Sequence, residues 1–257
     1  MKRWTVALPS EKWARWVEYF WLTEASEEGT FEVIPDGRFD LGIVLSRQTP
    51  RFVAYGVATK PRLLSMEAGV RYAGVRLRPG APLVSELAGL ARAKDDELSL
   101  TKIAGVAASD LVEGFPAGES ASVVEPCLSP VLDRSIGKGN SDTIWIRRAT
   151  DRIIGSRGTM RIEDLADALG VSRRFLELVF KRSLGISPKA FSKITRLGAL
   201  ANRIRAIEGN WSGVASDFGF SDQAHMNRDV SNMTGYTPRR FQERVELMPP
   251  GWAGGLD

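Results

Sequence analysis

The chemistry open to this chain of 257 residues is limited by its rarest reactive side chains. It contains one histidine, His225, and one cysteine, Cys127. These cannot build a disulfide framework, a multi-thiolate zinc site or a His-rich metal site, and Ser-His-Asp catalysis could run only through His225. No Gly-rich nucleotide-binding pattern is present. An enzyme would have to use carboxylates, for which Asp36 and Asp40 are the candidates. We expect no metal, no cofactor and no catalysis.

The distribution of charge indicates a different chemistry. The net charge is +4, but residues 141–248 carry 18 Lys and Arg against 12 Asp and Glu, net +6, and the remainder is net −2. A basic half joined to a near-neutral half suggests that only the basic half meets a polyanion. A solvated basic surface would give the same count, so the arrangement of the charges has to decide.

The basic half contains one short pattern twice, at residues 165–172 (LADALGVS) and 214–221 (VASDFGFS). In each copy an Ala leaves room for a crossing helix, a Gly accepts a positive φ at the turn, and the final Ser can cap the next helix. Each copy then ends alike, with GISP at 185–188 and GYTP at 235–238. Two copies in register predict two helix-turn-helix motifs.

Helical patterns extend through the whole basic half. They predict a first helix around Ile146 to Ile154, followed by helices over 162–169, 173–183 and 188–207. Ser187 and Pro188 form a strong start signal for the last of these. We expect that helix to span about 30 Å, at about 1.5 Å per residue.

The first half follows a different pattern. Short runs rich in β-branched and aromatic residues, separated by turn signals, predict strands over 31–34, 39–45, 51–55 and 70–77. Helices are expected over 10–22, 82–91 and 100–114. The predicted fold class is therefore α+β, with a small antiparallel sheet or partial barrel and its helices followed by an all-α domain.

Composition sets the expected boundaries. The small polar residues 137–142 form the best linker candidate, between one domain over 1–136 and another over 143–248. Residues 249–257 are rich in Pro and Gly, and we expect a loose tail.

Residues 145–244 resemble the AraC family of bacterial transcription regulators, most strongly at 219–228 (GFSDQAHMNR) and 234–238 (TGYTP). The resemblance implies two helix-turn-helix motifs, rigidly joined by a long helix, that read one DNA site. Adjacent major grooves on one face of DNA lie roughly 34 Å apart, close to the expected length of that helix. Double-stranded DNA is the implied partner, and RNA polymerase and a second copy of the chain are further candidates. No apolar run has membrane-spanning length and no secretory signal opens the chain, so we expect a cytoplasmic protein.

The resemblance places DNA contacts on the second helix of each motif. The residues expected there are Ser172, Arg173, Arg174, Glu177, Leu178, Lys181 and Arg182 in the first motif, and Ser221, Asp222, Gln223, Ala224, His225, Asn227 and Arg228 in the second. Most protein–DNA hydrogen bonds go to the backbone, so we expect Arg173, Arg174 and Lys181 on phosphates, and His225 on a base or a phosphate. Leu178 stands where Arg228 stands in the other copy. Arg can contact guanine through two hydrogen bonds and Leu offers only apolar contact, so base reading by the first motif stays open.

The first half resembles a domain fused to a subset of these regulators, through IPDG at 34–37 and GVRLRPG at 74–80. The resemblance implies an effector-sensing or dimerising domain. The candidates for effector contact are Trp13, Asp36, Arg38 and Arg76. The four tryptophans at positions 4, 13, 16 and 21 could stack on a ligand or belong to the core. An open apolar pocket with a few convergent polar groups would favour sensing, a filled barrel would favour a domain that only dimerises, and an enzyme using Asp36 and Asp40 is a third reading.

Overall fold

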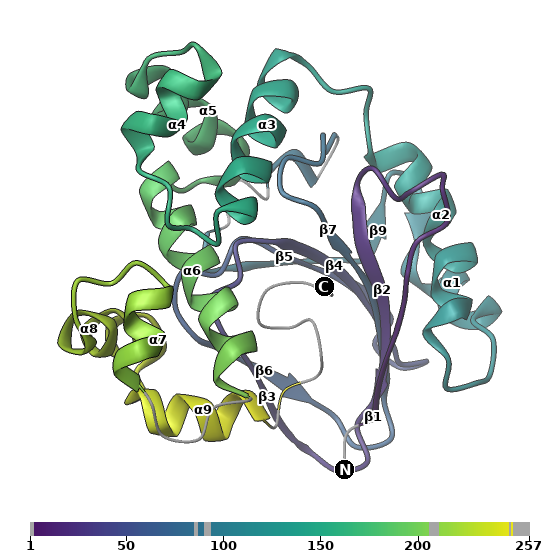
Figure 1. Cartoon of the computed structure of the whole chain (residues 1–257). Coiled ribbons are helices and arrows are strands. Elements are labelled where there is room, and N and C mark those ends of the chain that lie inside the picture. The colour runs from purple at the N-terminus through teal and green to yellow at the C-terminus, as the bar shows by residue number, and fades with distance from the viewer. Residues whose placement is uncertain (1–2, 85–86, 90–93, 206–210, 247, 249–257) are drawn as a thin grey trace.

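The computed structural model describes residues 3–84, 87–89, 94–205, 211–246 and 248, and its first half is built on an antiparallel sheet (Figure 1). Six strands lie in the order β1-β2-β7-β4-β5-β8. Their bounds are Arg3–Ala7 (β1), Val17–Glu24 (β2), Arg71–Leu77 (β7), Phe39–Leu45 (β4), Arg51–Tyr55 (β5) and Glu97–Leu100 (β8). The predicted strands over 39–45, 51–55 and 70–77 are therefore confirmed, and they occupy the centre of the sheet.

A second pair of strands, β3 (Gly29–Val33) and β6 (Arg62–Met66), faces the hollow side of this sheet. In Figure 1 the larger sheet curves along the top and right of the N-terminal half, and β3 and β6 lie below it. The strands thus form a partial barrel, and the α+β fold class is confirmed. Two short strands, β9 (Lys102–Ile103) and β10 (Val106–Ala107), form a separate hairpin.

Helices cover the outer side of the large sheet. They are α1 (Ala108–Gly114), a 3-10 turn over Ala121–Val123 and α2 (Val124–Ser135). Leu41 of β4 and Val75 of β7 point to this side and are fully buried in one cluster with Leu128 of α2. The alternation of strand residues therefore leaves the opposite, inner side free to carry polar groups.

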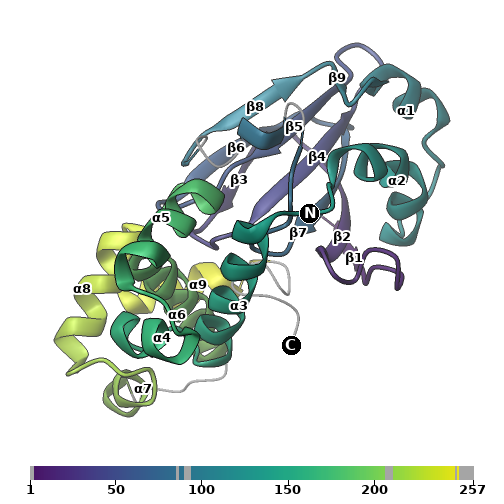
Figure 2. The same ribbon diagram turned by 90° about the horizontal axis from the view of Figure 1, so that it is seen from above.

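The second half is helical and lies beside the barrel as a separate layer (Figure 2). Its helices are α3 (Ser141–Gly155), α4 (Ile162–Leu169), α5 (Arg173–Leu184), α6 (Pro188–Ile204), α7 (Trp211–Asp217), α8 (Gln223–Thr234) and α9 (Pro238–Glu246). Asn140 closes a capping box with Thr143 at the start of α3, so the last two residues of the predicted linker form the first turn of this helix. Helix α6 joins the group of α4 and α5 to the group of α7 to α9.

The predicted helix over 10–22 is wrong. Residues 11–16 form turns and Val17–Glu24 is the strand β2, which lies between β1 and β7. Nearly every residue of β2 is buried, because one side meets α2 and the other lines the barrel. A strand buried on both sides has a continuous apolar run, and such a run also satisfies helical spacing.

The predicted helix over 100–114 is correct only in its second half. Residues 97–107 form short strands, and Ala104 and Gly105 adopt positive φ in the turn between two of them. Helix α1 begins only at Ala108. Of the predicted helix over 82–91, residues 87–89 form a 3-10 turn, and part of the segment and the whole tail over 249–257 lie outside the described residues. Within the described part of the chain, no helix is both long enough and apolar enough to cross a bilayer.

Candidate nucleic-acid interface and cavity

The turns of the two repeated motifs have the same backbone geometry. Gly170 follows α4 with φ of 67°, and Gly219 follows α7 with φ of 65°. Ala166 and Ala215, which the repeat placed where a second helix crosses, are 4% and 1% exposed. Residues with a Cβ rarely adopt this φ, so glycine at these two positions allows the chain to turn between the two helices of each motif.

The cap of the first second helix is the predicted one, and the cap of the other is not. Ser172 caps α5, and its Oγ accepts a hydrogen bond from the backbone N–H of Phe175 at 3.2 Å. In the second motif Asp222 caps α8 by accepting the N–H of His225 at 2.7 Å. Ser221 is not the cap; its hydroxyl donates to the Asp222 carboxylate. The second copy has one more residue before its helix, which moves the cap from the repeated Ser to Asp222.

Counted from these caps, Leu178 and Arg228 are equivalent, because each lies six residues beyond its cap. Leu178 is 47% exposed, and Arg228 is exposed as well. A large apolar side chain therefore stands in water at the position where the other motif presents a guanidinium.

Ion pairs hold several of the cations on α5. Arg173 contacts Glu163 at 2.9 Å and Glu177 at 3.0 Å, and Arg182 contacts Asp142 at 2.8 Å. Lys181 donates to a backbone carbonyl at the end of its own helix. Arg174 and Arg228 are exposed, and among the residues that the structure describes neither is in an ion pair. Each second helix therefore has one such exposed guanidinium, but Arg174 lies two residues beyond its cap and Arg228 lies six residues beyond its own.

His225 sits in a local network on α8. Its Nδ1 lies 3.2 Å from the Ser221 hydroxyl, its Nε2 lies 3.8 Å from Asp229, and its ring packs edge-on against Phe220. The ring is half-buried and faces the space between the two motifs. Gln223, Ala224 and Asn227 occupy the first two turns of the same helix.

A groove of about 380 Å³ separates the two motifs and brings together cations that the sequence analysis missed. They are Arg161 before α4 and Lys189, Lys193 and Arg196 on α6. The three α6 residues recur at intervals of four and three, which puts them on one face of the helix. Arg173 and His225 border the groove from the two second helices. The spacing of these three residues in the sequence is the signal that could have found them, because it places them on one face of the predicted helix over 188–207.

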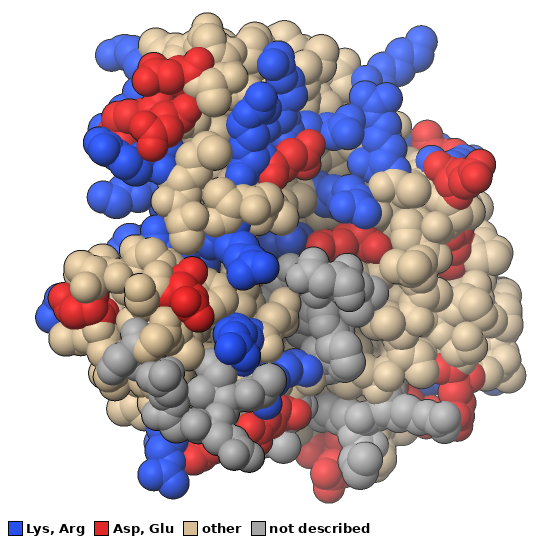
Figure 3. All heavy atoms as spheres, in the orientation of Figure 1, with Lys and Arg blue, Asp and Glu red and all other residues tan. Residues whose placement is uncertain are grey.

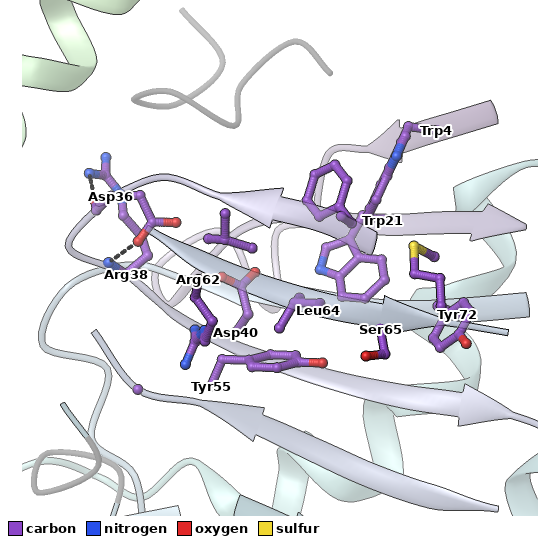
Figure 4. A pocket seen from close by; sticks show the side chains of 14 residues that line it. Trp4, Trp21, Asp36, Arg38, Asp40, Tyr55, Arg62, Leu64, Ser65 and Tyr72 are labelled. Atoms are coloured by element: carbon purple, nitrogen blue, oxygen red, sulfur yellow. Dashed lines mark hydrogen bonds between the residues drawn. The ribbon is translucent and has the colours of Figure 1, made fainter. Parts of the chain in front are cut away.

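A second hollow, which we call the barrel cavity, lies inside the N-terminal half between the large sheet and the β3–β6 pair (Figure 4). The space inside it that the centres of water-sized molecules can reach is small, about 40 Å³. The residues that line it are Trp4, Trp21, Phe31, Val33, Asp36, Arg38, Asp40, Tyr55, Gly56, Arg62, Leu64, Ser65, Met66 and Tyr72. Asp36 and Arg38 were expected here from the sequence, and Trp4 and Trp21 belong to this wall as well.

Two facing glycines make room for one of these tryptophans. Gly42 of β4 pairs with Gly74 of β7 at the inner side of the sheet, and the indole of Trp21 lies over both. A Cβ at Gly74 would collide with this indole and would lie 2.6 Å from the carbonyl oxygen of Leu41. The glycines therefore let a large aromatic ring lie flat on the floor of the cavity.

A buried ion-pair cluster lies at one end of the barrel cavity. Arg76 is 1% exposed, and its Nη2 lies 2.6 Å from Asp36 and 2.9 Å from Asp40. Burial raises the pKa of the Asp36 carboxyl, Arg76 opposes that rise, and the Asp40 carboxylate adds to it. Arg38 pairs separately with Glu18 at 3.1 Å. Of the four predicted effector contacts, Trp13 lies away from this cavity, on the outer side of the sheet, where its indole N–H donates to Ser129.

Comparisons with known proteins agree with this architecture. A helix-turn-helix domain model matches residues 165–244, and a domain of unknown function (DUF6597) matches residues 5–85. The chain is 31% identical to a "probable AraC family transcriptional regulator" from Rhodopseudomonas palustris and covers 94% of that chain and 38% of its own, with a TM-score of 0.34. The chain belongs to the AraC family.

Two further relatives extend the comparison. The Msm operon regulatory protein of Streptococcus mutans is 23% identical over 111 residues, which are 42% of this chain and 40% of that relative. This AraC-family chain therefore matches less than half the length of that relative. Apo ToxT from Vibrio cholerae is 10% identical, with a TM-score of 0.50 over 88% of this chain and 97% of that one. ToxT thus shares the fold of both halves.

In this AraC-family chain the barrel contacts the second motif directly. Glu32 of β3 is 9% exposed and accepts a hydrogen bond from the Tyr236 hydroxyl at 2.8 Å. Its other oxygen accepts two from Arg244 of α9, at 3.0 and 2.6 Å. We call these contacts the Glu32 latch. Phe31 and Val33, on either side of Glu32, line the barrel cavity, so β3 carries the cavity wall on one side and the latch on the other.

The turn at Asp36 to Arg38 is a second connection. Gly37 has φ of 70°, and a Cβ there would lie 3.1 Å from the ring of Phe191 on α6. Asp36 and Arg38 line the barrel cavity and also border a hollow of about 300 Å³ next to α6. One short turn is thus shared by the cavity wall and the helix that joins the two motifs.

Proposed function

We propose that this AraC-family chain is a sequence-specific DNA-binding transcription regulator whose barrel senses a small molecule. The main observation in favour of DNA binding is the pair of capped helices α5 and α8. They belong to two matching motifs, which helix α6 joins. Helix α6 has 17 residues, and so spans about 25 Å at about 1.5 Å per residue. That length is compatible with second helices in successive major grooves, roughly 34 Å apart.

The placement of charge supports the same proposal. Lys and Arg side chains gather in the upper part of Figure 3, where Figure 1 has α3 to α5, and fewer appear over the sheet at the right. The inter-motif groove is lined by five cations, Arg161, Arg173, Lys189, Lys193 and Arg196, and by two acids, Glu163 and Asp229, of which Asp229 pairs with Lys193 at 3.0 Å. We assign the three cations of α6 to the phosphates between the two major grooves. Arg228 is assigned to a base edge, and Arg174 to a phosphate.

Sensing is supported by the cavity itself. An open hollow with aromatic walls and a few buried charged groups suits a small molecule, whereas a domain that only dimerises needs no such space. Asp36 and Asp40 are both engaged by Arg76, which weighs against their use as a free acid and base. RNA polymerase and a second copy of the chain stay predictions from the family resemblance.

The DNA-binding proposal is tested on the full chain with a duplex selected from a random pool. With about six phosphate contacts, the slope of log K against log salt should be near −5, because each contact releases counterions. A flat salt response would contradict the proposal. The double variant K189A/K193A should reduce the slope by about 1 for each lost contact and leave the sequence preference unchanged. Lys12→Ala, an exposed change in the barrel domain, is the control and should leave the slope as it was.

A further inference from the structure

Helix α6 packs on the two motifs through two different buried clusters. Phe191 and Ile194, in its first half, belong to the cluster of the first motif, and Leu197 and Leu200 belong to the cluster of the second. Arg196 lies where one cluster gives way to the other along α6, which runs from the group of α4 and α5 to the group of α7 to α9 (Figure 1). The contacts of Arg196 therefore bear on how the two motifs are placed relative to each other.

The guanidinium of Arg196 contacts segments of both motifs. Its Nε and Nη2 donate to the backbone carbonyl of Gly158, in the loop that leads into α4, at 3.3 and 3.0 Å. The same group lies over the ring of Phe220, in the turn of the second motif, with 5.0 Å between its central carbon and the ring centroid. Because a guanidinium is planar, its N–H groups and its face can serve two partners in fixed directions, which an ammonium group cannot do.

The loop and the turn that Arg196 joins also lie close to each other. Gly158 has φ of 72°, and a Cβ there would collide with the carbonyl oxygen of Ser192, so the loop backbone lies directly on α6. A Cβ at Gly219 would lie 3.3 Å from the Cγ2 of Thr159, which places the turn of the second motif beside the loop of the first. We call this group the inter-motif junction; its members are Gly158, Thr159, Arg196, Gly219 and Phe220.

The inter-motif junction continues into α8. The ring of Phe220 packs edge-on against His225 in the first turn of this helix. Asp229, one turn later, pairs with Lys193 of α6 at 3.0 Å. Half-buried Met233, also on α8, packs on both buried clusters and supports the same arrangement. The orientation of α8 relative to the first motif is therefore tied to the position of the Arg196 guanidinium.

From these contacts, and resting on the proposed DNA-binding function, we propose that Arg196 is a positioning residue that makes the chain select DNA by the spacing of its two half-sites. One inserted base pair moves one half-site by about 3.4 Å and rotates it by about 35° relative to the other. Motifs held at one separation and angle cannot follow this change, whereas motifs with a looser junction can adjust. Nε and Nη2 serve Gly158, and Nη1 is left to meet a phosphate in the inter-motif groove, which Arg196 borders.

The test measures binding of the full chain to a selected duplex and to derivatives with one base pair inserted or removed between the half-sites. The half-sites are the base pairs at which single changes weaken binding. We expect each change of spacing to weaken binding of the parent protein at least about tenfold, because the base contacts of one motif are lost. Arg196→Lys keeps the charge but cannot hold both partners, so it should reduce this penalty to about threefold or less and leave the salt slope unchanged.

Two further variants separate positioning from charge. Arg161→Lys makes the same change at an exposed arginine that borders the same groove, and should retain the spacing penalty of the parent. Phe220→Leu keeps an apolar side chain in its cluster and removes the ring beside Arg196, so it should relax the spacing as Arg196→Lys does. Thermal unfolding of each variant checks that it folds.

A measurement without DNA tests the inter-motif junction by itself. Spin labels on Arg174→Cys and Asn232→Cys, both at exposed positions and in a Cys127→Ser background, report the distance between α5 and α8. We expect a narrow distribution of distances in the labelled parent and a broader one after Arg196→Lys. If no duplex binds, the proposed function and the selection by spacing both fail, and the distance distribution decides whether Arg196 holds the motifs.

Three results would overturn the inference. Equal binding of the parent protein to all spacings would show that the motifs are not held at one separation. An equal loss on every duplex after Arg196→Lys, with the spacing penalty retained, would leave Arg196 as a phosphate contact alone. A distance distribution that Arg196→Lys leaves unchanged would show that other contacts hold the two motifs.

Discussion

The two helix-turn-helix motifs share a local pattern and differ in how they are attached to the rest of the molecule. Leu176 and Phe180 of the first motif belong to one buried cluster that continues through α3 into the sheet. The second motif has a separate cluster, to which the barrel contributes only Ile34 among the described residues, and the polar Glu32 latch adds a further connection. The same motif can therefore be fixed to a sensor by a shared apolar core or by a few directional contacts.

The largest effect should come from a matched pair of core deletions. Phe180 and Phe241 are both fully buried, one in each cluster. Each change to Ala should cost about 3–5 kcal/mol. Phe180→Ala should lower the stability of barrel and first motif together, whereas Phe241→Ala should open α7 to α9 first. Amide hydrogen exchange distinguishes these outcomes, and identical exchange patterns in both variants would mean that the clusters are not separate in energy.

A smaller effect is expected where the second helices differ. Arg228→Ala should cost about 1–3 kcal/mol of DNA binding and relax the preference at one base pair, expected to be a guanine. Leu178→Ala removes no hydrogen bond, so it should cost less, and any lost preference should fall on a thymine methyl. Binding to all single-base changes of the selected duplex measures both. If Leu178→Ala loses more specificity than Arg228→Ala, the proposed division between the motifs is wrong.

Arg174→Ala is the control for that comparison. A residue that contacts only phosphate should weaken binding to all sequences alike and leave the order of preference intact. A change of preference with this variant would place Arg174 at a base edge.

A feature could be predicted from the sequence when its signal lies in neighbouring residues. The turn glycines, the cap Ser172 and the start of α6 at Pro188 depend on neighbouring residues, so local pattern was sufficient for them. The predicted cap of α8 was wrong because the second copy has one more residue, so that Ser221 and Asp222 are both good capping residues. Only the geometry of the folded helix decides between them.

The cavity was harder to predict, because its wall comes from seven separate strands, β1 to β7. Trp4, Tyr55 and Tyr72 are far apart in the chain, and strand pairing alone brings them to one inner side. Asp36 and Arg38 were found because they belong to a recognisable turn. Trp13 lies outside the cavity, and the sequence could not separate it from Trp21, because a predicted helix over 10–22 gives no indication that this part of the chain has an inner and an outer side of a sheet.

The Glu32 latch predicts a smaller and more local change. Glu32→Gln keeps an acceptor for Tyr236 and removes the charge that holds Arg244, so we expect a loss of about 1 kcal/mol, in the range of a hydrogen bond to a charged group at a half-exposed site. The loss should appear as faster amide exchange in α8 and α9, with α4 and α5 unchanged. Glu24→Gln, an exposed change on the same barrel, is the control. Uniformly faster exchange would show that the latch stabilises the whole chain rather than one motif.

The smallest effect separates the two helix caps by their dependence on pH. The His225 backbone N–H, followed by the Ser221 hydroxyl, lowers the pKa of the Asp222 carboxyl. A lowered pKa in the folded state means that the Asp222 cap contributes fully above the ordinary pKa of Asp, about 3.9, and that the contribution is lost as the pH falls through the lower, folded-state value. Asp222→Asn should therefore change stability slightly at neutral pH and not at all in strong acid.

Ser172 has no charge to lose, so Ser172→Ala should cost about 1 kcal/mol at every pH at which the chain is folded. Thermal unfolding of both variants and the parent protein between neutral pH and pH 3 measures the difference. If the effect of Ser172→Ala also vanishes in acid, the first motif has already unfolded locally at that pH. The local stabilities of the two motifs would then be more similar than their buried clusters indicate. If the effect of Asp222→Asn persists unchanged in acid, the difference between the two caps does not come from the carboxylate charge, and the proposed pH dependence is wrong.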